Sequence, residues 1–194
     1  MLQFLTSTLQ DCICDPREAV ARFVARGLSE GDLILLGATM VLLSTLTTQT
    51  ALLIGSNSLG ARPDTFVVLL ERNPLMWLAF YLTIYAISIP IARRISALFG
   101  GTATAYQTVA ALSFFQVLVF LTNVAESVLL VLLPPFAALA ALIAMGWLFY
   151  VLATFIDTLN GFDNLVGVAM GIIITGVACA FAVTLILTFL STFV

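Results

Sequence analysis

One acidic residue lies deep inside an apolar stretch of this sequence. Glu126 falls within the hydrophobic run of residues 106–133, which is long enough to cross a bilayer. An ionised carboxylate at that depth is costly unless it is paired or hydrated, and no Arg is predicted at that depth. Glu126 therefore indicates either a proton- or ion-linked site that faces water, or a packing site with hydrogen bonds from neighbouring helices. We favour the packing site.

Other polar residues share one face of the same predicted helix. At about 3.6 residues per turn, Ser113, Gln116, Asn123 and Ser127 fall within an arc of ~80°, with Glu126 at its edge. Lipid offers no hydrogen bonds, so this stripe is expected to face protein or trapped water. The other helices should therefore pack around this one. The predicted intramembrane polar cluster comprises Glu126, Asn123, Gln116, Gln49 and Tyr81.

The residue types argue against an enzyme. The sequence contains no His, which is the commonest general base near neutral pH and the commonest transition-metal ligand. Ser and Thr are abundant, but no base stands beside them to activate a nucleophile. Asp157 and Asp163 bracket a short turn and supply too few ligands for a metal ion. We expect no catalytic residues, no metal and no cofactor.

Two of the three cysteines lie close together ahead of the apolar spans. Cys12 and Cys14 occupy this segment, and Cys179 lies in the last span. This placement does not fit an oxidised structural framework. The pair is either a lipidation or redox site at the membrane face, or two free thiols that pack as small apolar residues. We favour the free thiols.

The composition is that of an integral membrane protein. Of 194 residues, 62% are hydrophobic and 9% are charged, and the mean hydropathy is +1.17. Ordinary soluble domains carry roughly 25% charged residues, so this inventory cannot build a water-exposed surface. The net charge of −3 is scattered and offers no basic patch for nucleic acid.

Five apolar stretches approach the ~20 residues that cross hydrocarbon. They are residues 33–55, 74–91, 106–133, 136–156 and 165–189. The sequence therefore predicts an all-α integral membrane protein with five transmembrane helices. We divide it into an amphipathic N-terminal segment, residues 1–32, and a five-helix transmembrane domain, residues 33–194.

The N-terminal segment predicts a short amphipathic helix. D-P-R-E at residues 15–18 supplies a capping Asp, a Pro for the first helical position and a Glu that can reach back. Val20 and Phe23 then fall on a different side from the arginines. This helix could lie on the cytoplasmic membrane surface, or it could pack under the bundle. On the membrane surface, the lipid-facing basic residues would be Arg17, Arg22 and Arg26.

Arginine placement predicts the orientation in the membrane. Five arginines fall near one side of the predicted spans, and only Arg62 and Arg72 fall on the other. Because basic residues concentrate in cytoplasmic loops, we expect a cytoplasmic N-terminus and an external C-terminus. The expected location is the cell membrane.

Two predicted cytoplasmic turns share a sequence pattern. Residues 95–100 and 156–161 both read I-x-x-L-x-G, so the flanking hairpins are either related repeats or a chance match. The turn residues are Gly100, Gly101, Gly161 and Phe162. In the last span, Gly167 and Gly171 form a GxxxG pattern, which suits self-association or packing on the Ala-rich fourth span.

These motifs, taken in order along the chain, resemble the Yip1 family, and in particular its short bacterial branch. The motifs are D-P-R-E-A at residues 15–19, F-G-G at 99–101 with Q-T at 107–108, and L-N-G-F at 159–162. The resemblance covers nearly the whole chain and implies five spans with a cytosolic N-terminus. Eukaryotic members act in vesicle traffic and associate with small GTPases largely through a longer cytosolic region. Here about 32 residues precede the first span, which weighs against carrying GTPase binding over.

We expect a non-enzymatic membrane scaffold or adaptor of the Yip1 type in a bacterial inner membrane. Its partners would be the lipid bilayer and, in addition, other membrane proteins or a second copy of the chain. The alternative is a small transporter or channel that uses the polar site around Glu126. A water-filled cavity reaching Glu126 would favour the alternative, and a sealed polar cluster would favour the scaffold.

Overall fold

The computed structural model describes residues 10–59 and 73–191, and within these ranges the chain folds into helices joined by short turns. The helices are α2 (Pro16–Val24), α3 (Glu30–Leu59), α5 (Pro74–Leu98), α6 (Ala105–Leu132), α7 (Pro134–Asn160) and α8 (Leu165–Ser191). The expected all-α architecture is confirmed.

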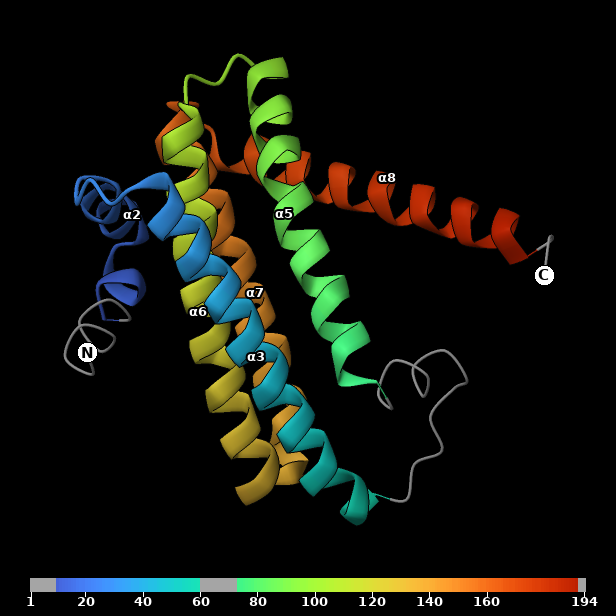
Figure 1. The fold of residues 1–194 in the computed structure, drawn as a ribbon. Coiled ribbons are helices and arrows are strands. Elements are labelled where there is room, and N and C mark those ends of the chain that lie inside the picture. Colours follow the sequence, from blue (N-terminus) through green and yellow to red (C-terminus); the bar gives the residue numbers. More distant parts are fainter. Residues whose placement is uncertain (1–9, 60–72, 192–194) are drawn as a thin grey trace.

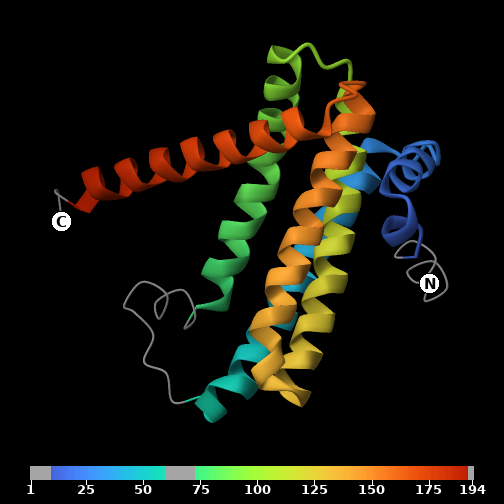
Figure 2. The ribbon, with the colours of Figure 1, turned by 180° about the vertical axis from the view of Figure 1, so that it is seen from behind.

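Helix α6 is the element around which the others pack. Figures 1 and 2 both show it alongside α3 and α7, and α2 and α5 also contact it. The side chains that it buries recur at helical spacing. They include Val109, Ala110, Ser113, Phe114, Val117 and Leu118. Small residues at two of these positions let the neighbouring helices approach closely, as is usual between membrane helices.

Helix α2 packs against one end of the bundle. Its buried face consists of Pro16, Ala19, Val20 and Phe23. The Phe23 ring stacks on Phe114 of α6 with centroids 4.5 Å apart, and Phe114 stacks on Phe155 of α7 at 5.4 Å. The apolar face of α2 is therefore covered by α6 and α7. This is the packed arrangement that the sequence left open, and contact of α2 with a membrane surface stays a prediction.

Helices α3 and α5 come into close contact at a glycine. A Cβ atom added at Gly37 would overlap the hydroxyl end of Tyr85. The Tyr85 hydroxyl lies 2.9 Å from Ser113 Oγ, and Ser113 Oγ donates in turn to the Val109 carbonyl oxygen. The Tyr85 hydroxyl is therefore the donor to Ser113. Helices α3, α5 and α6 meet at this buried contact, which joins α5 to α3 and α6.

Four helices in the described ranges are long and apolar enough to span a membrane. They are Glu30–Ala51, Pro74–Leu98, Ala105–Leu132 and Pro134–Asn160, while Leu165–Ala178 of α8 is a shorter apolar helix. Figures 1 and 2 show α8 leaving the end of α7 and running away from the bundle at a steep angle. The fifth span stays a prediction.

Candidate functional site

The five residues of the predicted polar cluster are distributed over three helices. Gln116, Asn123 and Glu126 lie half-buried on α6, Gln49 lies half-buried on α3, and Tyr81 is exposed on α5. Among the described residues, none of the five side chains donates a hydrogen bond to another. The Tyr81 ring instead stacks on Trp77 with centroids 5.1 Å apart. Within the described part of the chain, the half-buried Glu126 carboxyl group therefore has no hydrogen-bond partner.

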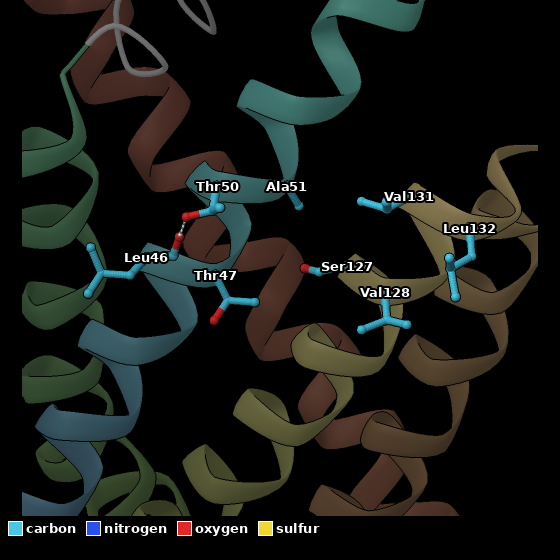
Figure 3. Close-up of a pocket in the computed structure, with 8 residues that line it drawn as sticks. All are labelled: Leu46, Thr47, Thr50, Ala51, Ser127, Val128, Val131 and Leu132. Carbon is cyan, nitrogen blue, oxygen red and sulfur yellow. Dashed lines mark hydrogen bonds between the residues drawn. The ribbon is translucent and has the colours of Figure 1, made fainter.

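A hollow lies between α3 and α6 at the level of Ser127. Its volume is about 490 Å³, and eight residues line it. Figure 3 shows Thr47 and Ser127 facing each other across the hollow. Ser127 is the chain neighbour of Glu126, which is not itself in the lining. The Thr47 and Thr50 hydroxyls donate to backbone carbonyl oxygens of their own helix, each at 2.8 Å. Because their hydrogens are used in this way, these two hydroxyl oxygens can only accept hydrogen bonds from a molecule in the hollow. The hollow is therefore a weakly polar groove.

A fully buried charged group lies elsewhere, at the end of the bundle where α2 packs. Asp157 is 1% exposed, and its Oδ2 atom accepts from Arg17 of α2 at 2.8 Å. Its Oδ1 atom accepts from the backbone N–H of Asn164 at 3.0 Å. Asn164 in turn caps α8, since its Oδ1 atom accepts from Gly167 N. One carboxylate therefore connects α2, the end of α7 and the start of α8.

Asn160 connects the same end of α7 to the turn before α6. It is 5% exposed, and its Oδ1 atom accepts from the Ala103 N–H at 3.3 Å while its Nδ2 atom donates to the Ile156 carbonyl oxygen at 2.8 Å. The Thr102 hydroxyl donates to the Asn160 carbonyl oxygen. A Cβ atom at Gly101 would overlap the Asn160 side chain. The two predicted turns are thus in contact with each other.

The shared I-x-x-L-x-G pattern corresponds to a shared backbone structure. Gly100 and Gly161 both adopt the left-handed conformation, with φ values of 78° and 64°. In each turn, the N–H of the next residue donates to the carbonyl oxygen five residues earlier, at 2.7 Å and 3.3 Å respectively. This is the glycine-dependent helix termination in which only a residue without a Cβ fits easily. The pattern therefore encodes two helix ends of the same kind.

The position of Asp157 in its helix is a sequence feature that indicates an ion pair. Asp157 lies in the last turn of α7, where the helix dipole disfavours a negative charge. A carboxylate in that position indicates a compensating donor, which the structure identifies as Arg17, 140 residues away. Because nothing in the local sequence specifies so distant a contact, spacing alone could not identify the partner. The Asn160 contacts were missed for the same reason.

The other two arginines of the predicted lipid-facing set are exposed. Arg22 lies 3.3 Å from Asp11 and 3.7 Å from Glu18, and the Arg26 guanidinium lies 5.9 Å from the Phe23 ring centroid. The two ion pairs of Arg22 are at the surface, where such pairs contribute little. Lipid contact of Arg17, Arg22 and Arg26 stays a prediction, and Arg62 and Arg72 lie outside the described residues.

The two glycines of the GxxxG pattern lie on α8 near its start. A Cβ atom at Gly171 would meet nothing within 4 Å, and one at Gly167 would overlap only the Asn164 side chain of its own cap. Both residues line a cavity between α5 and α8. Neither of them is therefore packed on the Ala-rich face of α7 in this structure.

The N-terminal thiols differ in their surroundings. Cys12 is fully buried, whereas Cys14 is exposed. Burial raises the pKa of the Cys12 thiol from 9.0 to about 12, the charge of Asp11 adds to the rise, and Arg22 opposes it. At neutral pH the Cys12 thiol is therefore protonated and shielded, which suits a packing role and not a reactive one. No group of three metal-ligating side chains occurs within residues 10–59 and 73–191.

The Yip1 domain family matches residues 11–187. No curated protein and no solved structure shows a significant match. The family match spans α2, the two glycine turns and the apolar helices, so it covers the segments from which the resemblance was drawn. The chain belongs to the Yip1 domain family.

Proposed function

We propose that this multi-pass membrane protein is a non-enzymatic scaffold or adaptor that binds other membrane proteins at the end of the bundle formed by α2 and the two glycine turns. This surface is ordered by the Arg17–Asp157 pair, the Asn160 contacts and the stack of phenylalanine rings. Its charged and polar groups serve to join chain segments, and no nucleophile–base pair stands among them.

One observation carries this proposal. Leu98 and Phe99, at the end of α5, are 83% and 69% exposed. They follow Arg93 and Arg94, which mark the headgroup level of the membrane by the basic-residue rule. Large apolar side chains beyond that level are in contact with water unless another protein covers them, and such exposure is typical of interaction sites.

The described arginines support a cytoplasmic location for this surface. Arg17, Arg22 and Arg26 lie in or next to α2, and Arg93 and Arg94 lie near the end of α5. Figure 1 shows α2, the end of α5 and the start of α8 at one end of the molecule. We infer that this end faces the cytoplasm of a cell whose membrane holds the protein, with the N-terminus inside.

Affinity purification tests the scaffold role. Tagged wild type and Leu98→Ser would be purified in mild detergent, and the co-purifying proteins identified by mass. Ile143→Ser, which changes another large, exposed apolar side chain, on α7, serves as the control. We expect a membrane protein that co-purifies with wild type and with Ile143→Ser but is lost with Leu98→Ser. Equal recovery from all three would exclude Leu98 from the binding surface.

A small transporter or channel is the second candidate function. The hollow between α3 and α6 supports it, because Ser127, the chain neighbour of Glu126, lines the hollow together with the acceptor oxygens of Thr47 and Thr50. A coupling carboxylate must titrate, so Glu126→Gln should abolish proton or cation flux in liposomes while leaving the fold intact. A neutral packing residue should instead tolerate Gln, which keeps its shape. If wild type shows proton or cation flux and Glu126→Gln does not, the protein is a transporter or channel and the scaffold proposal is wrong.

A further inference from the structure

A second cavity lies between α5 and α8. Its volume is about 560 Å³, and Leu112 of α6 and Leu152 and Ile156 of α7 contribute to its lining. Protein interiors contain few voids larger than a water molecule, so a cavity of this size has room for a further packing element. The two helix faces that border it indicate which element fits.

The face of α5 that borders the cavity carries small residues one helical turn apart. Residues four positions apart lie on the same side of a helix, and the small ones here are Ser88, Ala92 and Ser96. The Ser88 hydroxyl donates to the Tyr85 carbonyl oxygen at 2.7 Å, so its hydrogen needs no acceptor from another helix. Another helix can therefore approach this face closely.

The face of α8 on the other side of the cavity has the same spacing. Gly167, Gly171 and Thr175 recur at every fourth position and line the cavity. A Cβ atom at Gly171 would meet nothing within 4 Å, so no atom of α5 fills the space above this glycine. Small residues at this spacing let helices pack closely. In this structure, however, α8 contacts mainly α7.

The two small-residue faces match in register. Helix α5 ends at the end of the bundle where α8 begins, so the two helices laid side by side would be antiparallel (Figure 1). A step of four residues back along α5 then corresponds to a step of four residues forward along α8. Pairing the small residues nearest that end sets Ser96 opposite Gly167, Ala92 opposite Gly171 and Ser88 opposite Thr175. Because α8 instead leaves the bundle at a steep angle, the faces cannot meet along their length (Figures 1 and 2).

The turn before α8 can act as a pivot. Gly161 and Asp163 adopt the left-handed conformation there, with φ values of 64° and 49°. A change of φ and ψ at a few such positions is enough to redirect a whole helix. The Asn164 N–H is meanwhile tethered to the bundle, since it donates to Asp157 Oδ1 at 3.0 Å. Helix α8 can therefore change direction while its start stays at the end of α7.

We propose that α8 is a lid that closes onto α5, antiparallel to it, so that its glycine face fills the cavity. The steeply directed α8 of the structure is the open position of this lid. Closing replaces the open walls of the cavity by van der Waals contacts between two matched helix faces. This inference goes beyond the scaffold role, because it concerns a movement within the chain and does not depend on Leu98.

Disulfide formation between α5 and α8 tests the closed position. Ser88→Cys and Thr175→Cys would be introduced together into a full chain whose native cysteines are replaced by Ala, and the protein oxidised mildly in liposomes. A disulfide needs Cα atoms within about 7 Å, and of the three pairs this one lies farthest from the pivot, so its bridging reports closure along the whole face. We expect an intrachain disulfide, seen as a mobility shift of the monomer band without reductant.

A second cysteine pair is the matched control. It combines Ser88→Cys with Ile173→Cys, whose native side chain is 47% exposed and, at 100° per residue, points away from the lining face of α8. This pair should stay reduced. No bridge in the first pair, or equal bridging in the two, would overturn the proposal. A disulfide-linked dimer would assign the α5 face to a second copy of the chain, and would overturn it as well.

A pair of glycine variants tests why the lid can close. In the chain with the first cysteine pair, Gly171→Leu adds a side chain between the two faces, whereas Gly146→Leu adds it on an open face of α7. The bridge should be lost with Gly171→Leu and kept with Gly146→Leu, and a bridge that survives both would contradict the proposal. If Gly171→Leu fails to fold, the two cysteine pairs decide by themselves. Because none of these changes touches Leu98, a failed cross-linking result leaves the scaffold test unaffected.

Discussion

At the scale of single residues, the two N-terminal thiols share a sequence context but not an environment. Cys12 is fully buried with a pKa of about 12, and Cys14 two residues later is exposed. A thiol reacts as its thiolate and only when reagents can reach it. The structure therefore separates two residues that the sequence could treat only as a pair.

Maleimide labelling of single-cysteine variants checks this difference. With Cys179 replaced by Ser, a chain that keeps only Cys14 should label rapidly at pH 7, and one that keeps only Cys12 should label only after denaturation. The physical reason is that Cys12 is both protonated and covered by its neighbours. Equal labelling rates in the folded protein would mean that the segment before α2 opens readily.

Local caps were predictable from sequence because each depends on neighbours three residues apart. Asp15 Oδ1 accepts from Glu18 N at 3.1 Å, as the D-P-R-E motif predicts. Thr104 and Gln107 form a reciprocal capping box at the start of α6, as the T-x-x-Q spacing favours. The surroundings of Glu126 depend on how separate helices approach, and no spacing rule specifies them. The sequence could predict that Glu126 is a carboxylate within an apolar helix, but not which side chains surround it.

At the scale of helices, the α3–α5 contact depends on a missing side chain. The sequence predicted both helices, but gave no reason to single out Gly37 within a long apolar run. Its role depends on the approach of Tyr85 from another helix. The same limit explains why the two turns were predicted while their mutual contact through Asn160 was not.

Substitution of Gly37 should therefore be damaging. Gly37→Ala would push α5 away from α3 and disrupt the Tyr85–Ser113 hydrogen bond, which lowers the melting temperature in detergent. Gly146→Ala is the control, because its Cβ meets nothing within 4 Å and Ala favours a helix by roughly 1 kcal/mol over Gly. Tyr85→Leu should partly restore Gly37→Ala, since leucine lacks the ring end that clashes. Identical melting of the two Gly→Ala variants would mean that α5 is not held at this contact.

The Arg17–Asp157 pair should stabilise the junction of α2, α7 and α8. Arg17→Gln leaves a buried carboxylate with one remaining backbone donor, and we expect a loss of about 1–3 kcal/mol. Asp157→Asn should cost less, because the half-exposed Arg17 can be hydrated and Asn retains an acceptor for Asn164. Arg22→Gln is the matched control, since its partners are exposed and contribute at most about 1 kcal/mol.

Thermal unfolding of the single and double variants measures this coupling. The double variant Arg17→Gln/Asp157→Asn should melt at a higher temperature than the sum of the two single losses predicts. Strict additivity would mean that the pair does not contribute to stability, and α2 would then be held mainly by the Phe23 stack.

At the scale of the whole molecule, hydropathy predicted the bundle but not the direction of every helix. Four described helices satisfy the length and apolarity of a span, and two of them, α3 and α7, lie alongside a third, α6. Helix α8 has no charged residue, so composition alone predicts a fifth span. Its steep departure from the bundle is set by the turn at Gly161 and the cap at Asn164. Hydropathy reports that a helix prefers lipid, but not the angle at which it crosses its neighbours.

The fate of α8 decides the topology, and reporter fusions measure it. A protein that fluoresces only in the cytoplasm would be fused before Leu33, after Gly161 and after Val194, with periplasmically active alkaline phosphatase as the reciprocal reporter. If α8 crosses the bilayer, the first two fusions fluoresce and the last is silent, because an odd number of spans places the termini on opposite sides. If α8 stays along the membrane surface, all three fluoresce and the five-span prediction fails. Silence at Gly161 would contradict the arginine-based orientation itself, since that turn is in contact with the turn that follows Arg93 and Arg94.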